Sequence, residues 1–188
     1  MIKPFLAAAG CVAVLTLGGC GTPQQTPDPG PTTSEQDGQQ ANTEPMGDSC
    51  NGSFGETDRQ GDLTVPANAT CELSNVDVTG TVKVETGASL ILNNTGVGGN
   101  VEGTQFSAVT LSGGRIEGNV SLSNGNVVVL ENTAVNGSAE LTAISDQVQL
   151  TSNQIGGNLA CKDNPAAPAG QDNTVSGQAQ DQCQQLGG

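Results

Sequence analysis

The chain has no histidine, no tryptophan and no tyrosine, and only three phenylalanines among its 188 residues. Histidine is the side chain that most often transfers protons near neutral pH, so the commonest general acid and base is missing. Aromatic side chains are the usual stacking platforms for sugars and bases, and only Phe54 and Phe106 follow the N-terminal apolar run. This composition argues against acid–base catalysis and against the stacking of flat ligands.

Positive charge is also scarce. The chain has 5 lysines and arginines against 19 aspartates and glutamates, and its formal net charge is −14. After Cys20 four basic residues face all nineteen acidic ones, which gives a net charge of −15. The four are Arg59, Lys83, Arg115 and Lys162. Such a charge repels nucleic acid and anionic lipid headgroups, and we expect neither as a partner.

The longest apolar run covers residues 5–17 and follows a single positive charge at Lys3. It is too short to cross a bilayer as a permanent helix, but it has the length of the apolar region of a signal peptide. The run ends in Leu17-Gly18-Gly19-Cys20, which resembles a bacterial lipobox. The resemblance implies a lipoprotein signal peptide over residues 1–19, cleavage between Gly19 and Cys20, and acylation of Cys20.

This anchor would make the lipid bilayer the first partner of the chain. Acyl chains add about 0.8 kcal/mol of membrane affinity per buried CH₂, and two or more chains hold a protein stably. The expected location is the outer face of the cell membrane, or the outer membrane in a Gram-negative source. A second match, residues 8–11, has a shorter apolar run and a poor first residue in Ala8, so Cys11 is expected inside the signal peptide. Ordinary secretory cleavage near Cys20, without a lipid, is the alternative.

Residues 20–49 consist mainly of proline, glutamine, threonine, glycine and acidic residues, with no aliphatic or aromatic side chain except Ala41 and Met46. Such a composition cannot seed a core and predicts a disordered segment with polyproline II character. As a flexible coil it would span on the order of 30 Å. We interpret residues 20–49 as a tether that holds the folded part away from the membrane.

The rest of the chain repeats itself every 19 or 20 residues. A glycine column contains Gly61, Gly80, Gly99, Gly118, Gly137, Gly157 and Gly177. The residues two places later are Leu63, Val82, Val101, Val120, Ala139, Leu159 and Ala179. A second apolar column contains Cys71, Leu90, Val109, Val128 and Val148, and a third contains Leu73, Leu92, Leu111, Leu130 and Leu150. A fourth contains Val78, Val97, Ile116, Val135, Ile155 and Val175.

Within each repeat the apolar residues come in i, i+2 pairs, the period of a strand with one buried face. Three short strands per repeat bury these faces only if successive repeats stack as coils about 4.8 Å apart. The sequence therefore predicts an all-β parallel β-helix of about six coils over residues 61–179. Uneven spacing of the apolar positions favours the right-handed form over a left-handed hexapeptide helix. Glycines are expected at corners that need φ > 0 or close backbone approach, and a β-sandwich is the alternative fold.

The Gly-Asn-Val motifs and the ladders that follow them resemble bactofilin-type, polymer-forming β-helix proteins. A closer resemblance rests on TVPANATCEL, VGGNVEG and the Cys161…Cys183 ending of residues 61–183. In these features the chain resembles a group of secreted, functionally uncharacterised β-helix lipoproteins of actinobacteria and some other bacteria. Neither resemblance implies catalytic residues.

Four cysteines remain in the folded part: Cys50, Cys71, Cys161 and Cys183. An even number in an exported chain predicts disulfides. Cys71 would lie in the first coil and Cys161 in the last, too far apart to bond, and the other crossed pairing fails for the same reason. The expected bonds are therefore Cys50–Cys71 and Cys161–Cys183, each worth about 3 kcal/mol by loop entropy. A metal site is the alternative, but the chain has no histidine and no Cys-x-x-Cys pair.

These bonds would hold an N-terminal cap, residues 50–60, and a C-terminal cap and tail, residues 180–188, over the two ends. Exposed strand edges at the ends of a β-helix invite end-to-end stacking. Covered ends predict a monomer instead of a filament.

The same repeat places the outward-facing residues of successive coils in columns. One column would contain Lys83, Glu102, Ser121, Glu140 and Ala160, and another Asp77, Gly96, Arg115, Ala134 and Gln154. Lys83 and Glu102 are expected to form a surface ion pair across two coils. Glu117 and Glu140 could bind calcium weakly, but no phosphate loop, calcium-binding repeat or nucleophile–base pair is present. The sequence predicts no catalytic residue, no metal and no cofactor.

The leading hypothesis is a non-catalytic, surface-exposed envelope lipoprotein with a structural or interaction role, contacting envelope polymer or a surface protein. A carbohydrate-binding or carbohydrate-active β-helix is the first alternative, and an envelope filament is the second.

Overall fold

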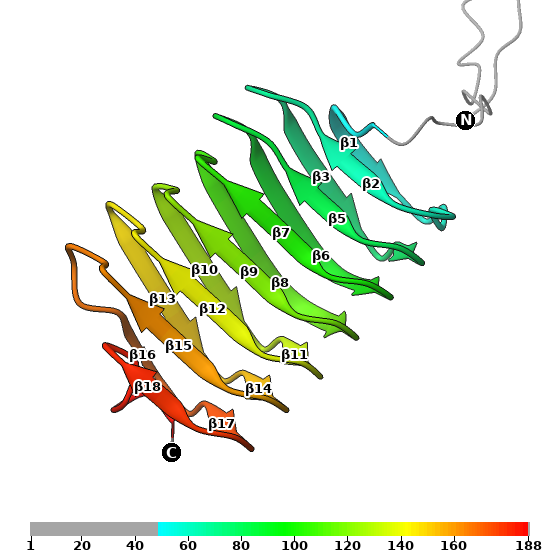
Figure 1. Ribbon diagram of the computed structural model, residues 1–188. Coiled ribbons are helices and arrows are strands. Elements are labelled where there is room, and N and C mark those ends of the chain that lie inside the picture. Colours follow the sequence, from blue (N-terminus) through cyan, green and yellow to red (C-terminus); the bar gives the residue numbers. More distant parts are fainter. Residues whose placement is uncertain (1–48, 188) are drawn as a thin grey trace, which may run out of the picture. The chain divides into compact units, whose positions relative to one another are not determined.

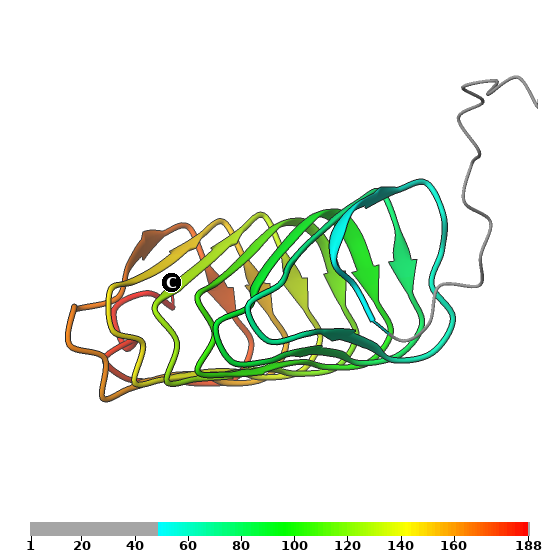
Figure 2. The ribbon, with the colours of Figure 1, turned by 90° about the horizontal axis from the view of Figure 1, so that it is seen from above.

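In the computed structural model, the residues that can be described, 49–187, form a parallel β-helix of about seven turns with no α-helix. The expected signal peptide and most of the expected tether lie outside these residues. Figure 1 shows the turns stacked one after another along a single axis, and Figure 2 shows them as successive loops around a shared interior.

The first strands of the turns form a seven-stranded parallel sheet. Its members are β2 (Leu63–Val65), β5 (Val82–Val84), β7 (Val101–Thr104), β9 (Val120–Ser123), β12 (Ala139–Thr142), β15 (Leu159–Lys162) and β18 (Ala179–Asp181). We call it the first sheet.

The second strands follow the order β1-β3-β6-β8-β10-β13-β16 and form the second sheet. They are β1 (Gly52–Gly55), β3 (Thr70–Ser74), β6 (Ser89–Val97), β8 (Ala108–Ile116), β10 (Val127–Glu131), β13 (Gln147–Thr151) and β16 (Ala169–Gln171). The third face is narrow and joins this sheet. It consists of β4 (Asp77–Val78), the ends of β6 and β8, β11 (Ala134–Val135), β14 (Gln154–Ile155) and β17 (Thr174–Val175).

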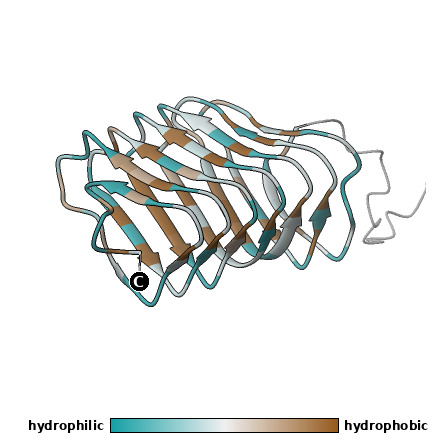
Figure 3. Cartoon of the chain, turned by 60° about the horizontal axis from the view of Figure 1, so that its bottom comes forward, coloured by the Kyte–Doolittle hydropathy of each residue, from teal (hydrophilic) through white to brown (hydrophobic). Residues whose placement is uncertain are grey.

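The register of the strands confirms the columns expected from the sequence. Leu90 pairs with Cys71 and Val109, Leu92 with Leu73 and Leu111, and Val97 with Val78 and Ile116. The column residues from Leu63 to Leu159 are almost all fully buried. Figure 3 shows hydrophobic residues recurring at the same place in successive strands. The i, i+2 pairs of the sequence therefore form the continuous core of the helix.

At most positions of the glycine column, a positive φ is not the reason that glycine is required. Only Gly61 has a positive φ, 89°, while the later members have none. A Cβ on Gly118 would lie 2.3 Å from Asn100 Oδ1 and 2.6 Å from the carbonyl oxygen of Gly99. The column therefore contains glycine because successive turns approach each other closely at this corner.

The residue after each glycine holds the turns together at that corner. The side-chain oxygen of Asn100 accepts the backbone N–H of Asn119 at 2.9 Å, and Asn119 Oδ1 accepts that of Ser138 at 2.9 Å. Ser138 Oγ in turn accepts the N–H of Asn158 at 3.0 Å. The oxygen that makes each bond occupies the space that a glycine Cβ would fill.

Left-handed backbone recurs at two corners of the repeat. After the second strand its residues are Glu56, Asn75, Asn94, Gly113, Asn132, Ser152 and Asp172. After the first strand they are Asn68, Gly87, Gln105, Asn124, Ala143, Asp163 and Asp181. Asparagine tolerates this conformation better than most residues.

The structure has about seven turns instead of the six counted from the glycines. The difference arises at the N-terminus, because residues 50–60 continue the repeat instead of only covering it. Strand β1 pairs in parallel with β3, with Phe54 opposite Leu73, and Arg59 forms a bridge with Val78.

Candidate functional site

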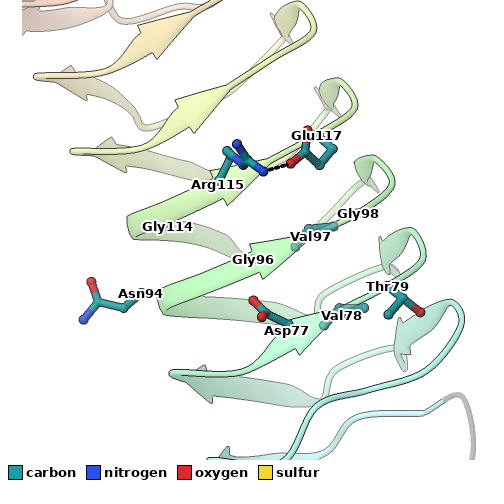
Figure 4. A pocket seen from close by; sticks show the side chains of 10 residues that line it. All are labelled: Asp77, Val78, Thr79, Asn94, Gly96, Val97, Gly98, Gly114, Arg115 and Glu117. Atoms are coloured by element: carbon teal, nitrogen blue, oxygen red, sulfur yellow. Dashed lines mark ion pairs between the residues drawn. The ribbon is translucent and has the colours of Figure 1, made fainter.

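The third face contains a hollow that we call the glycine hollow. It has a volume of about 450 Å³, and its polar side chains are Asp77, Thr79, Asn94, Arg115 and Glu117. Figure 4 shows Asp77 and Thr79 on one turn, Arg115 and Glu117 two turns away, and Gly96 and Gly98 on the turn between them. The volume falls in the range of small-molecule sites.

The parallel register produces this hollow. Asp77 pairs with Gly96, and Gly96 pairs with Arg115. In the neighbouring outward column, Gly98 N–H donates to the carbonyl oxygen of Val78 at 2.8 Å, which places Gly98 in line with Thr79. Two turns that bear side chains therefore flank one turn that has none at these two positions.

Neither glycine tolerates a side chain without rearrangement. A Cβ on Gly98 would lie 2.4 Å from the carbonyl oxygen of Thr79, and one on Gly96 would lie 2.3 Å from Asp77 Oδ1. Because the Thr79 contact is with backbone, it cannot be relieved by a side-chain rotation. The glycine floor is therefore a property of the local packing and not only of the sequence.

The two sides of the hollow differ in charge. Asp77 is exposed on one side, and on the other Arg115 pairs with Glu117, with side chains 62% and 39% exposed. Glu117 also accepts a hydrogen bond from Asn136 Nδ2 on the next turn. The Arg115–Glu117 pair is the only ion pair among residues 49–187. Asn136 and Glu117 thus hold the guanidinium beside the hollow.

A second, smaller depression of about 270 Å³ lies on the first sheet, between Lys83, Glu102, Thr104, Ser121 and Ser123. Its hydroxyl groups contact one another weakly, since Ser123 Oγ lies 3.4 Å from Thr104 Oγ1. Lys83 and Ser121 are both register partners of Glu102, on opposite sides of it. They are therefore two turns apart, about 9.6 Å, which is too far for a base to activate a nucleophile.

Across the middle four turns, the outer face of the second sheet carries one charged residue, Glu131. Its first two outward columns there are Ser89, Ala108, Val127 and Gln147, and Ile91, Thr110, Val129 and Gln149. Except for Gln147, these residues are partly exposed, including the isoleucine and both valines. The charged residues flanking depressions lie instead on the first sheet and the third face.

Both expected disulfides are present. Cys50 bonds to Cys71 with a Cα–Cα distance of 5.4 Å, and Cys161 bonds to Cys183 at 5.2 Å. All four side chains are buried. Each bond links an end segment to the turn beneath it. The expected cleavage and acylation residues, Gly19 and Cys20, lie outside the described residues.

The expected ion pair between Lys83 and Glu102 is wrong. The two residues are register partners, as predicted, but no ion pair joins them in the described part of the chain. Glu102 Oε1 instead accepts a hydrogen bond from Asn100 Nδ2 at 3.0 Å, a contact within its own turn. A bond between close neighbours orders fewer torsions than a lysine stretched along the surface, which favours this partner.

The two candidate calcium ligands lie in different sheets. Glu140 is in β12 of the first sheet, while Glu117 follows β8 on the third face and is held by Arg115. No group of three or more aspartate, glutamate, cysteine or histidine side chains with metal-binding geometry occurs within residues 49–187.

Arg59 is a feature that reading the sequence missed. It lies in the inward-facing Val78 column at the N-terminal end, where it is 8% exposed. Its guanidinium carbon lies 4.4 Å from the centre of the Phe54 ring, and Nε and Nη2 are buried without a hydrogen-bond partner in the described residues. The repeat spacing does predict an inward position for both residues, because Arg59 is 19 residues before Val78 and Phe54 is 19 residues before Leu73.

At the C-terminal end, Gln182 takes the place of a further strand. Its side chain accepts the N–H of Asn164 at 2.8 Å and donates to the Asn164 carbonyl at 2.7 Å. Leu186 packs against the core beside it. Side chains therefore cover both ends of the stack.

Together, these features define a parallel β-helix whose ends are held by disulfides and whose third face carries the glycine hollow. No family model matches the chain, and neither a curated protein nor a solved structure matches it. The resemblances to bactofilin-type and actinobacterial β-helix proteins stay predictions. Residues 49–187 contain no helix long and apolar enough to span a membrane.

Proposed function

We propose that the protein is an exported lipoprotein, acylated at Cys20, which displays a rigid, acidic and non-catalytic β-helix at the cell envelope. There it has an interaction role, contacting an envelope polymer or a surface protein through its sides. The lipobox-like Leu17-Gly18-Gly19-Cys20 supports the anchor. The net charge of −15 after Cys20 suits a body held away from an anionic surface.

The pair of disulfides carries this proposal. Such bonds form and persist in oxidising compartments outside the cytosol. Here both occupy structural positions, with all four sulfur-bearing side chains buried in the core at the two ends. They support export, and the polar hollow on the third face supports contact through the side of the β-helix.

Labelling with a palmitate analogue in a bacterial host tests the anchor. Wild-type chain and the matched control Cys11→Ser should incorporate the label and remain in the membrane fraction. Cys20→Ser should incorporate none and should stay as an unprocessed precursor. Label retained by Cys20→Ser, or lost by Cys11→Ser, would contradict acylation at Cys20.

A carbohydrate-active β-helix is the second candidate, and one observation favours it. Asp77 and Glu117 line the same hollow, and most glycosidases use a pair of carboxylates that flank the scissile bond. Against it, Glu117 is committed to Arg115 and Asn136, and the hollow has no aromatic side chain in its lining. A glycan array with a reducing-end assay separates the two candidates, and turnover of any polymer that Asp77→Asn abolishes would favour the enzyme.

A further inference from the structure

We propose that the glycine hollow binds a small zwitterion, a free amino acid, with its ammonium group at Asp77 and its carboxylate at Arg115. The inference rests on the interaction role proposed above, but it does not depend on the lipid anchor. It gives the third face a ligand class, and it assigns Asp77, Arg115 and Glu117 separate roles.

The separation of charge across the hollow carries the inference. Asp77 stands on one side without an ion-pair partner in the described residues, and Arg115 stands on the other. The turn between them offers only glycine at its outward positions 96 and 98. A ligand whose own charges are separated in the opposite sense complements this arrangement, whereas a simple anion or cation meets one favourable and one unfavourable side.

Arg115 keeps donors free for such a ligand. A guanidinium has five N–H donors in a rigid fork, and the exposed pair with Glu117 uses only part of them. The Glu117 carboxylate is fixed in turn by Asn136 Nδ2. Glu117 is therefore a positioning residue, which orients Arg115 toward the end of the hollow, and Arg115 itself contacts the ligand carboxylate.

The opposite side is anchored as well. The backbone N–H of Asp77 donates to Asp58 Oδ1 at 3.1 Å, so the strand that presents the carboxylate is tied to the preceding turn. Thr79 Oγ1 accepts the Gly61 N–H at 2.8 Å and keeps its own O–H proton for a ligand oxygen. Both groups are therefore placed before a ligand arrives.

The size of the hollow limits the ligand. Two turns of a parallel β-helix are about 9.6 Å apart, and an extended residue spans about 3.5 Å. After two polar contacts of about 2.8 Å, about 4 Å is left between the two sides, which admits one residue. The floor itself offers no strand edge, because Gly96 is already paired with Asp77 and Arg115 in the sheet. Longer peptides therefore cannot add to it as a strand.

Chemical-shift titration of the full chain carrying Cys20→Ser tests the proposal. Glycine should cause saturable shifts in the amide resonances of Gly96, Gly98 and Gly114. Glycinamide lacks the carboxylate and N-acetylglycine lacks the ammonium group, so each should bind at least about threefold more weakly. Cellobiose, a neutral saccharide, should leave the three resonances unmoved.

Matched variants assign the contacts. Asp77→Asn should weaken the binding of glycine while leaving that of N-acetylglycine unchanged. Arg115→Gln should weaken the binding of glycine while leaving that of glycinamide unchanged. Glu117→Gln should weaken every ligand that has a carboxylate, and the remote control Lys83→Gln should change nothing. These residues are exposed, so the remaining resonances report that the fold is intact.

Absence of saturable shifts at millimolar glycine would overturn the inference, as would equal binding of glycine and N-acetylglycine. Shifts caused by cellobiose alone would assign the hollow to saccharides instead. None of these results affects acylation of Cys20, which the labelling experiment reports independently.

Discussion

Asn153 is buried in the corner between the second sheet and the third face, and its amide is fully used. Nδ2 donates to the Leu130 carbonyl at 2.8 Å, and Oδ1 accepts the Thr133 N–H at 3.0 Å. On the next turn Asn173 donates to the Leu150 carbonyl at 2.8 Å in the same way. The backbone groups of a corner cannot all pair within the sheets, so these side chains supply the missing partners.

Asn153→Ala should therefore lower the free energy of unfolding by about 2–3 kcal/mol, because it leaves a buried N–H and a buried carbonyl unpaired. The matched control is Asn158→Ala, an exposed asparagine whose Oδ1 accepts one N–H, from Gln178 at 2.9 Å. The control should cost less than about 1 kcal/mol, since water replaces the lost bond. Urea unfolding measures both, and equal losses would show that burial of the amide is unimportant.

Gly118 illustrates close approach between turns. Gly118→Ala should cost about 1–3 kcal/mol, because its Cβ would overlap both Asn100 Oδ1 and the Gly99 carbonyl oxygen. Removing the side chain in Gly118→Ala/Asn100→Ala should restore little, since the backbone oxygen still lies 2.6 Å away. The control is Gly55→Ala, whose nearest neighbour is the Ser74 carbonyl oxygen at 3.4 Å. Thermal unfolding compares the three, and full rescue by Asn100→Ala would contradict the backbone contact.

At the scale of the strands, the sequence is sufficient to predict the register wherever a column of similar residues repeats. A single residue such as Leu92 predicts no register by itself. Five leucines at nearly constant spacing require stacked strands, and the parallel pairing of Leu92 with Leu73 and Leu111 follows from that spacing. The same spacing places Glu102 opposite Lys83. It does not predict their hydrogen bonds, because a long side chain chooses among neighbours by torsion and solvation.

The glycine hollow was harder to predict for a related reason. The sequence correctly predicts the column Asp77, Gly96 and Arg115, but it predicts no binding site on that column. A hollow depends on what is absent from two adjacent columns at once, here at Gly96 and Gly98. The orientation of Arg115 toward Glu117 is a side-chain torsion that spacing alone does not determine.

The end strands depend on the disulfides more than the middle strands do. Cys161→Ser/Cys183→Ser should lower the free energy of unfolding by about 3 kcal/mol, since the bond closes a loop with a sequence separation of 22 residues. Hydrogen exchange should then accelerate in β16, β17 and β18 and remain slow in β1 and β3. Cys50→Ser/Cys71→Ser should give the reverse pattern. Uniform acceleration in either variant would show that the bonds do not act locally.

At the scale of the whole molecule, Arg59 decides how the N-terminal end meets solvent. It occupies a position that is valine or isoleucine in the turns beyond, and a charge pointing inward at a strand edge opposes the stacking of another molecule. Its stacking on Phe54 recovers part of the cost of burying a guanidinium of which two nitrogens have no hydrogen-bond partner among residues 49–187. A residue that is unfavourable for folding is therefore well placed to keep the β-helix monomeric.

Arg59→Leu should stabilise the folded monomer and should also promote its association, so the two effects can be measured separately. Removing an unpaired buried charge should raise the free energy of unfolding, by about 1–4 kcal/mol. It should also leave an apolar end that stacks on a second molecule, so sedimentation velocity should show concentration-dependent species that the wild type lacks. Lys83→Leu is the matched control, since it makes the same change in charge and side chain on the first sheet and should remain monomeric.

If Arg59→Leu stays monomeric, the disulfide-held segments and Gln182 are sufficient to close the ends. If the wild type itself forms polymers, closed ends are ruled out, and the envelope filament becomes the better interpretation of this β-helix.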